Sequence, residues 1–369
     1  MQFVTKRENL LSETFLVQGI VEKRSTRPIL TNVLLESDAD SVGIYATDLE
    51  VGLSSRFAAQ VDQAGAITAP ARKLADIVRL LPEKQDVLVE VMENNYLRIT
   101  CGKIEYKLSG APKEDFPVVP RFDFASGIEI PAQLLKAMIV RTLYAITAEE
   151  TRYALNGAQI SLDGESIKMV TTDAHRLAYV EQLFDGYDGE AIEILVPRKT
   201  VAELRTLIDE RLDSVIFGHT ENHLFFRIGE RVLDSRVLEG QFPSYDKVLP
   251  KGNDKEIRLD RSTFSNAIGR VALLSHETSH AVRLSVTKGS LLVSSSNPEM
   301  GEAKEEIDAG YDGPELSIGF NAKYITDFIG SLETDEVILE LKDEASAGLM
   351  RPGGDIEGVY KYVIMPMRI

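Results

Sequence analysis

The chain has 369 residues, and its hydrophobic fraction of 44% is enough for two or three domains with sizeable cores. Its 41 Lys and Arg against 58 Asp and Glu give a net charge of −17, which discourages non-specific adhesion to nucleic acid or anionic membranes but leaves room for a local basic surface. The single cysteine, Cys101, excludes an intrachain disulfide and a cysteine metal cluster. The N-terminus lacks a signal-peptide core and no apolar run has the length of a membrane span, so we expect a cytoplasmic protein.

Two helices and several strands recur in the same order three times. The apolar spacing predicts a first amphipathic helix in each repeat, at residues 5–23, 131–147 and 260–275. Alternating strands follow, among them residues 32–38, 157–164 and 282–289. A second helix comes next, at residues 68–82, 195–209 and 318–333. Further alternating strands follow, with Asn-Asn and Glu-Asn hairpin turns inside residues 87–102 and 214–229.

Three sets of aligned residues share one period of about 125 positions. A polar motif after a strand aligns Asp48, Asp173 and Asn297. The start of the second helix aligns Lys73, Lys199 and Lys323. A proline motif after the last strands aligns Pro117, Pro243 and Pro366. Because three independent sets agree, the sequence predicts three structurally similar domains, at about 1–120, 127–250 and 253–369.

Two helices and many antiparallel strands in each domain predict an α+β fold, with the helices packed on sheet. Repeats that join head to tail form an open filament or a closed ring. If the first domain joins the second as the second joins the third, the free edges of the first and third domains match, and a second copy of the chain supplies the missing partner. Two chains would then close a ring of six domains, with the helices lining the hole.

The predicted helices are more basic than the rest of the chain. Residues 131–147 carry two cations and no acid, and residues 71–82 carry three cations and one acid. In a single domain, ordinary solvated helix faces would account for such cations. Three repeats that present the same face favour a weakly positive surface on an otherwise negative molecule.

The segment HETSH at residues 276–280 matches the zinc-protease pattern, in which two histidines one helical turn apart hold the metal and the glutamate acts as general base. A zinc metallohydrolase is therefore the alternative function. It requires a helix and a third ligand. The repeat instead places the segment where the first helix of the third domain ends, and Thr278 and Ser279 favour a helix end.

The remaining histidines offer no catalytic group. Asp173 and His175 are two residues apart and share one face of a strand, but no nucleophile or metal ligand accompanies them, so we expect a structural or binding role. His219 and His223 flank a predicted hairpin turn, and we interpret them as part of a solvated loop.

The chain resembles the bacterial DNA polymerase III beta subunits, or sliding clamps, over essentially its whole length. The motifs that carry this resemblance are PIL-x-N-x-LLE (28–36), TDLE (47–50), PARK (70–73), RYALNG (152–157), TTDAHRL (171–177), VPRK (196–199), FP-x-Y (242–245), NPE (297–299), GFN (319–321) and YVIMPMRI (362–369). The resemblance implies a head-to-tail homodimeric ring that encircles duplex DNA and tethers the replicative polymerase. It also implies loading by an ATP-driven clamp loader, no cofactor, no metal and no enzymatic activity of its own.

The resemblance further implies two sets of contact residues. Those expected to face DNA, through sequence-independent phosphate and sugar contacts, are Arg24, Arg72, Arg79, Tyr153, Arg198 and Lys199. Those expected to form a groove between domains 2 and 3 for short hydrophobic motifs of polymerases, the loader and repair proteins are Leu155, Thr172, Ala174, His175, Arg176, Leu177, Pro243, Lys247, Val248, Ser279, Asn321, Tyr324, Val363, Met365, Pro366, Met367 and Arg368.

Several of these positions depart from familiar members of the family. Ala174 stands where glycine is usual, Lys247 where arginine is, and Ser279 where an aromatic residue is frequent. Glu149 and Ala154 also differ, which bears on the DNA contacts of that loop.

For the dimer, we expect a basic strip of domain 1 to meet an acidic strip of domain 3. The residues of the two strips are Lys73, Arg98, Lys103 and Lys107 on one side, and Leu273, Leu274, Glu302, Glu305 and Glu306 on the other.

Overall fold

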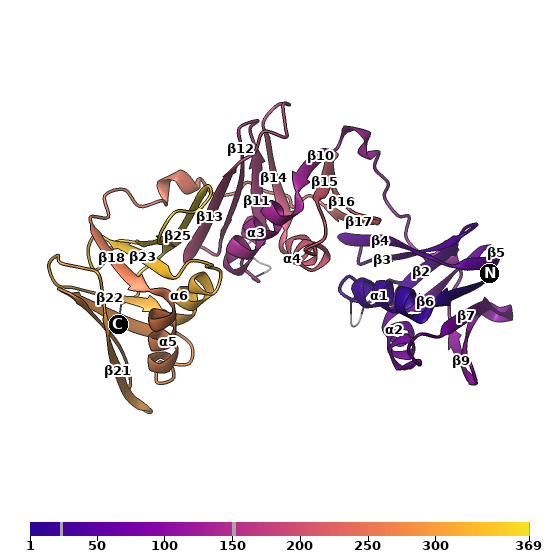
Figure 1. Ribbon diagram of the computed structural model, residues 1–369, viewed down its shortest axis with the longest axis horizontal. Helices are drawn as coiled ribbons and strands as arrows, with labels where there is room; N and C mark the ends of the chain where they lie inside the picture. Colours follow the sequence, from indigo (N-terminus) through magenta and orange to yellow (C-terminus); the bar gives the residue numbers. More distant parts are fainter. Residues whose placement is uncertain (23–24, 150–152, 369) are drawn as a thin grey trace. The chain divides into compact units, whose positions relative to one another are not determined.

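The computed structural model describes residues 1–22, 25–149 and 153–368 (Figure 1). Its contacts divide the chain into two compact units, Met1–Leu134 with Ala202–Val237, and Leu135–Val201 with Leu238–Ile369. This division assigns one part of the central repeat to each unit and does not test the domain limits. The limits 1–120, 127–250 and 253–369 therefore remain a prediction. The order of helices and strands nevertheless recurs three times, as the sequence predicts.

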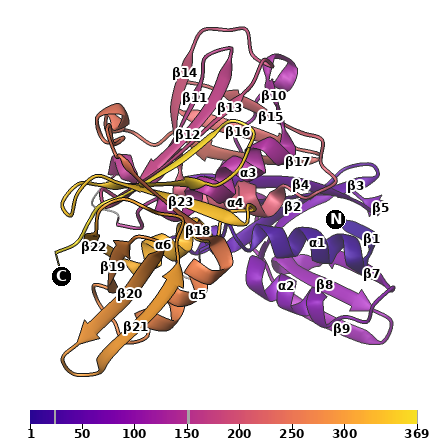
Figure 2. The same ribbon diagram turned by 60° about the vertical axis from the view of Figure 1, so that its left-hand side comes forward.

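Each repeat contributes two α-helices. Their bounds are α1 (Arg7–Val17), α2 (Ala71–Leu80), α3 (Ala132–Thr142), α4 (Arg198–Leu207), α5 (Arg261–Ala272) and α6 (Ala322–Ile329). Helix α1 lies beside α2, and α5 beside α6, in both views (Figures 1 and 2). The first helix of each repeat is shorter than the sequence predicts, because its last turns unwind into turns or a short 3₁₀ segment such as Leu143–Ala145.

The first unit contains two antiparallel sheets. One has five strands in the order β5-β1-β7-β8-β9, with bounds β1 (Gln2–Lys6), β5 (Gln60–Gln63), β7 (Asp86–Val91), β8 (Tyr96–Cys101) and β9 (Ile104–Ser109). The other has eight strands in the order β10-β15-β16-β17-β4-β3-β2-β6, with bounds β2 (Asn32–Ser37), β3 (Ser41–Thr47), β4 (Val51–Ala58), β6 (Gly65–Pro70), β10 (Ile128–Pro131), β15 (Ser214–His219), β16 (His223–Ile228) and β17 (Arg231–Arg236). Because β17 pairs with β4, this sheet continues from the first repeat into the central one.

The second unit repeats this plan. Its eight-stranded sheet has the order β14-β11-β12-β13-β25-β24-β23-β18, with bounds β11 (Gly157–Leu162), β12 (Ser166–Thr172), β13 (Arg176–Leu183), β14 (Ile192–Pro197), β18 (Lys255–Asp260), β23 (Glu336–Leu341), β24 (Gly348–Pro352) and β25 (Val359–Ile364). Its four-stranded sheet has the order β21-β20-β19-β22, with bounds β19 (Ala281–Thr287), β20 (Ser290–Asn297), β21 (Gly301–Asp308) and β22 (Leu316–Asn321). Here β13 pairs with β25, which joins the central repeat to the third.

The helices bury one stripe and expose the other. Helix α2 buries Ala71, Leu74, Ala75 and Val78, spaced as one face of a helix. Helix α5 begins at Asp260, whose carboxylate accepts a hydrogen bond from the Thr263 amide at 2.7 Å. The exposed side of α2 carries Arg72, Lys73 and Arg79 together with Leu80. Among the described residues, no helix is long and apolar enough to cross a membrane.

HETSH lies in a turn after α5, not on a helix. The His280 amide donates to the His276 carbonyl at 2.8 Å, and His280 has a φ of 48°, which a helix does not allow. The part of the chain that the structure describes contains no group of three or more His, Cys, Asp or Glu side chains arranged to hold a metal ion. The geometry that a zinc hydrolase requires is therefore missing from this segment.

Both predicted hairpin turns are confirmed, Asn94-Asn95 between β7 and β8 and Glu221-Asn222 between β15 and β16. Asn94 and Asn95 adopt left-handed φ values of 61° and 59° between β7 and β8, as an Asn-Asn turn requires. The loop interpretation of the second histidine pair is wrong. His219 ends β15 and His223 begins β16, and each ring stacks on a phenylalanine of its own strand.

Candidate partner groove and strand edges

A cavity of about 200 Å³ in the second unit is lined mainly by apolar side chains. Nine of the predicted groove residues line it, together with two that were not predicted, and the full set is Leu155, Thr172, Ala174, Arg176, Leu177, Phe242, Pro243, Tyr245, Val248, Val363 and Met365. The two additional residues are Phe242 and Tyr245, which belong to the motif FP-x-Y. Both are aromatic residues close to Pro243, which was itself predicted to line the groove. This proximity could have identified them as further groove residues.

The other predicted groove residues lie elsewhere around this unit. Pro366, Met367 and Arg368 line a separate cavity of about 510 Å³, and Lys247 lines a third. The side chains of His175 and Ser279 are not among those lining the first cavity, although the Ser279 carbonyl accepts a hydrogen bond from Asn321 at 3.1 Å.

The turn between β12 and β13 forms one wall of the 200 Å³ cavity. The Asp173 carboxylate accepts hydrogen bonds from the amides of His175 and Arg176 at 2.9 and 3.0 Å, and Thr172 Oγ1 donates to the Arg176 carbonyl at 2.6 Å. Ala174 at the tip has a φ of 74°, in the left-handed region where glycine is favoured. Asp173 therefore shapes a turn, which agrees with a structural role, but the prediction that Asp173 and His175 share a face of a strand is wrong because both lie between β12 and β13.

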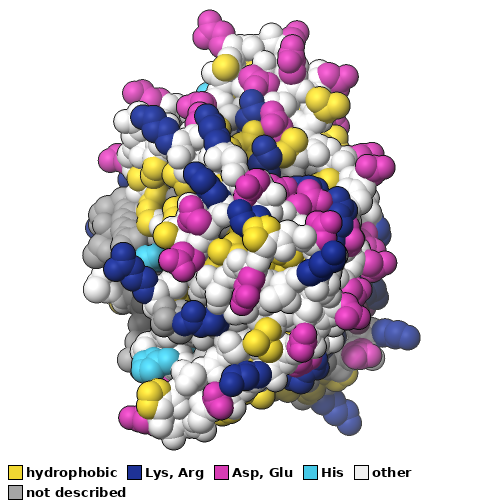
Figure 3. Space-filling model, turned by 90° about the vertical axis from the view of Figure 1, so that its left-hand side faces the viewer, with side chains coloured by type: hydrophobic (Ala, Val, Ile, Leu, Met, Phe, Trp, Pro, Cys, Tyr) yellow, Lys and Arg dark blue, Asp and Glu magenta, His cyan; other side chains and the backbone are white. Residues whose placement is uncertain are grey.

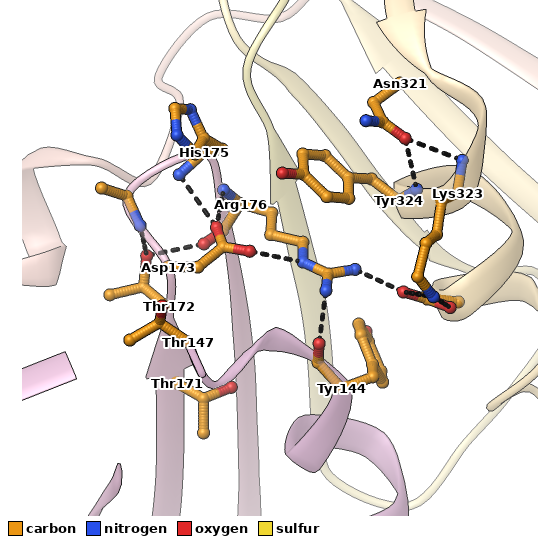
Figure 4. A network of polar contacts seen from close by, with 12 residues as sticks. Tyr144, Thr147, Thr171, Thr172, Asp173, His175, Arg176, Asn321, Lys323 and Tyr324 are labelled. Carbon is orange, nitrogen blue, oxygen red and sulfur yellow. Dashed lines mark hydrogen bonds and ion pairs between the residues drawn. The ribbon is translucent and has the colours of Figure 1, made fainter. Parts of the chain in front are cut away.

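Arg176 connects this turn to helix α6 and to the 3₁₀ segment Leu143–Ala145 (Figure 4). Its guanidinium pairs with Asp173 at 2.9 Å and with Asp327 of α6 at 2.7 Å, and it donates to the Tyr144 carbonyl. It also lies over the Tyr324 ring, 4.3 Å from the centroid. Burial disfavours the charged guanidinium, but nearby Tyr362 and the two carboxylates raise the pKa of Arg176 above its ordinary value. Arg176 is thus a fixed cation in the wall of the cavity.

The C-terminal tail forms strand β25 (Val359–Ile364) and then continues as a segment held by backbone hydrogen bonds. Tyr362 and Ile364 are fully buried in β25, as predicted for the strand part of the tail. Beyond it, the Met365 amide donates to the His175 carbonyl at 3.0 Å and the Met367 amide to the Gly319 carbonyl at 2.8 Å. These backbone bonds leave the Met365 side chain in the lining of the 200 Å³ cavity.

Four of the six predicted DNA-facing residues lie on the second helices α2 and α4. Arg72 and Arg79 are exposed on α2, and Arg79 pairs with Asp76 at 3.0 Å. Arg198 is exposed at the start of α4, and Lys199 follows it half-buried. Arg24 and the Tyr153 side chain lie outside the described residues. On the face shown in Figure 3, Lys and Arg side chains are interspersed with Asp and Glu.

Of the predicted basic strip, Lys103 and Lys107 lie at an edge of the five-stranded sheet, whereas Arg98 lies on the inner strand β8 and Lys73 on helix α2. Strand β9 is at this edge, and its side chains alternate between half-buried and exposed. Lys103 precedes β9 in the hairpin turn, and Lys107 Nζ lies 4.4 Å from the centre of the Tyr96 ring. Arg98 pairs with Glu90 at 2.8 Å on the neighbouring strands, and Lys73 is exposed on α2.

The predicted acidic strip lies along an edge of the four-stranded sheet. Strand β21 is at this edge, and Glu302 and Glu306 are exposed on it. Glu305 is already paired with Arg270 of α5 at 2.6 Å, so it is not a free carboxylate. Leu273 is 75% exposed just after α5, while Leu274 is half-buried. Each unit therefore has an edge strand with charged side chains.

Comparison with known proteins agrees with this architecture. Family models of the DNA polymerase III beta subunit match in three parts: the N-terminal domain over residues 1–120, the central domain over 129–244 and the C-terminal domain over 246–368. The beta sliding clamp of Caulobacter vibrioides is 37% identical and that of Pseudomonas putida is 36% identical, each with 100% of both chains covered. The crystal structure of the Pseudomonas aeruginosa DNA polymerase III subunit beta is 35% identical and superposes with a TM-score of 0.93 over 100% of both chains.

These matches cover the whole chain and all three repeats, and they leave the zinc hydrolase alternative without support. They confirm the predicted three-domain α+β clamp fold and its role in DNA replication. The chain belongs to the family of bacterial DNA polymerase III beta subunits, the beta sliding clamps.

Proposed function

We propose that two copies of this chain close a head-to-tail ring around duplex DNA and tether DNA polymerase III to it. The chain then acts as a processivity factor, without catalysis of its own, in the bacterial cytoplasm. The observation that carries this proposal is the way in which the repeats join. Both internal junctions are antiparallel strand pairs, β17 with β4 and β25 with β13. The corresponding strands left at sheet edges are β9 and β21.

The repeat also predicts how β9 and β21 align. At the internal junctions, Asp234 lies opposite Gly52, and Val363 lies opposite Leu177. The paired residues can be followed across each sheet, from the first strand of a repeat to its last strand. On the last strands, Lys107 of β9 then occupies the position that Asp234 has on β17 and Val363 has on β25.

The position on β21 follows from the preceding hairpin. Thr47, Thr172 and Ser296 occupy the same position in the three repeats. Their hairpin partners are Gly52, Leu177 and Glu302, so Glu302 corresponds to Gly52 and Leu177. Lys107 of one copy should therefore lie opposite Glu302 of the other. The same alignment places Glu105 opposite Lys304 and Lys103 opposite Glu306. Three complementary charge pairs on one face support this alignment.

The charge distribution suits a ring that slides. A protein that holds DNA by adhesion needs many phosphate contacts, and its affinity falls steeply with salt. A closed ring holds DNA by topology and needs only a weakly positive lining, for which the exposed cations of α2 and α4 are the candidates. The Lys323 ammonium on α6 corresponds to Lys73 and Lys199, and it pairs with Asp327 at 2.9 Å.

The 200 Å³ cavity is proposed as the docking site for short hydrophobic motifs of the polymerase alpha subunit, the clamp loader and other replication proteins. Its size fits one or two large apolar side chains, and its lining is mainly apolar. The Asp173 turn and the Arg176 network hold its wall in place before a partner arrives, which reduces the entropy lost on binding.

Retention on DNA templates tests the ring. The clamp, loaded by its loader and ATP, should stay on nicked circular DNA in 0.5 M salt and leave after the same DNA is cut once. A protein that adheres to phosphates would be lost from both forms in high salt. Equal loss from circular and linear DNA would contradict the ring.

A further inference from the structure

A second cleft, of about 520 Å³, lies beside the groove in the same unit. One wall is the segment 246–253, and the other is the turn between β23 and β24 at residues 342–347. Val248 lines both this cleft and the 200 Å³ groove, so the two hollows adjoin. Leu249 and Ala347 pack against the same apolar cluster that forms the groove floor.

The cleft walls are fixed by hydrogen bonds. Asn253 Nδ2 donates to the Glu340 and Ala347 carbonyls at 2.9 and 3.1 Å, which ties one wall to the other. The Asp343 carboxylate accepts from the amides of Ala345 and Ser346 at 3.0 and 2.7 Å, which holds the turn in one shape. The cleft is therefore built into the fold.

Three exposed lysines gather around this cleft, although the chain is strongly acidic. They are Lys247, Lys251 and Lys342, with Asp246 as the one acidic side chain among the lining residues. Across the described ranges, none of the three lysines has a carboxylate within ion-pair distance. Their ammonium groups are available to a bound partner.

We propose that this cleft binds acidic residues that flank the hydrophobic motif of a docked partner. The inference rests on the proposed groove. Charge complementarity supports an acidic occupant, and the wall shared at Val248 places its residues next to the apolar anchors. Aspartates within a few residues of the anchors would reach the lysines without any change in the groove itself.

Fluorescence anisotropy with three labelled peptides tests the proposal. All three contain the apolar pair Leu-Phe; one has Gly-Ser flanks, one has three aspartates before the pair and one has three after it. We expect one acidic version to bind roughly fivefold more tightly than the Gly-Ser version at 50 mM salt, because two or three exposed ion pairs give gains of this order. The advantage should disappear at 0.5 M salt, where the Debye length is only a few ångströms.

The variants Lys251→Glu and Lys342→Glu should remove the acidic advantage and leave the affinity for the Gly-Ser peptide unchanged. Lys288→Glu, the same change at an exposed turn between β19 and β20, is the matched control and should keep the advantage. Equal affinity of the three peptides for the unchanged protein would overturn the cleft assignment alone. No binding of any peptide would overturn the groove and the cleft together. Weaker binding of labelled duplex DNA by the two variants, with unchanged peptide affinities, would show that the lysines serve DNA and would overturn the proposal.

Discussion

Reversing the charge of Lys107 should open the ring, and a second reversal at Glu302 should close it again. On the proposed alignment, the two side chains face each other across the junction of two copies. Lys107→Glu places two carboxylates opposite each other, and Glu302→Lys places two ammonium groups there. The double variant restores opposite charges with their positions exchanged.

The size of the effect follows from the exposure of the two strands. A favourable cross-strand charge pair contributes about 0.2–1 kcal/mol, and a like-charge pair costs a similar amount. One reversal therefore costs about 0.4–2 kcal/mol at each junction. A closed ring of two copies has two junctions, so the total is about 1–4 kcal/mol, or roughly a fivefold to thousandfold weaker dimer.

Sedimentation velocity over a series of protein concentrations measures this change. Each single variant should shift the monomer–dimer transition to higher concentration, and the double variant should return toward the unchanged protein. As a control, Lys288→Glu changes the net charge by the same amount in the turn between β19 and β20, outside the proposed strand pair. If the double variant is as monomeric as the singles, the two residues do not face each other and the alignment is wrong.

Three further predictions concern the groove and the first junction. Ala174→Gly should raise the free energy of unfolding by about 1 kcal/mol, because a φ of 74° strains alanine but not glycine; chemical denaturation that shows a loss would contradict this. Deletion of residues 365–369 should abolish binding of the Leu-Phe peptide in anisotropy and leave the dimer intact, since Met365 lines the cavity; unchanged affinity would remove the groove assignment. Burial raises the pKa of Asp234 to about 6, so protonation stabilises the fold and stability falls as pH rises from 4 to 7. Asp234→Asn should therefore gain about 1–3 kcal/mol at pH 8, and the gain should fade toward pH 4; a gain independent of pH in denaturation curves would contradict this reasoning.

The repeated order of helices and strands could be predicted because each element depends on residues that are close together in the sequence. The spacing of Leu74 and Val78 defines the buried face of α2, and the Asn-Asn pair defines a hairpin turn. The ends of the first helices were less predictable, because apolar spacing continues past Val17 although the chain already turns there. The two histidines of HETSH were misleading in the same way. Their spacing of four residues matches one turn of a helix, but the backbone at His280 is not helical.

The joining of repeats through continuous sheets could be anticipated only in outline. Which strands pair across a junction depends on contacts between residues almost two hundred positions apart, such as Ser54 with Val232. The Arg176 network was likewise hidden, because Asp327 lies about 150 positions away from it. Resemblance placed Arg176 in the groove, but the structure shows that its guanidinium is anchored to α6 and to the Asp173 turn. Its contribution is to hold the wall in place.

The β13–β25 junction within the chain and the proposed junction between copies differ in composition, and the difference suits loading onto DNA. Within the chain, Val363 and Leu177 meet at a fully buried strand pair, and burial of such apolar side chains stabilises the junction strongly. Between copies, the corresponding pair is Lys107 with Glu302, and exposed charges contribute little. Of these two junctions, the proposed one between β9 and β21 should therefore open more readily, and its charges would still specify the alignment on closure.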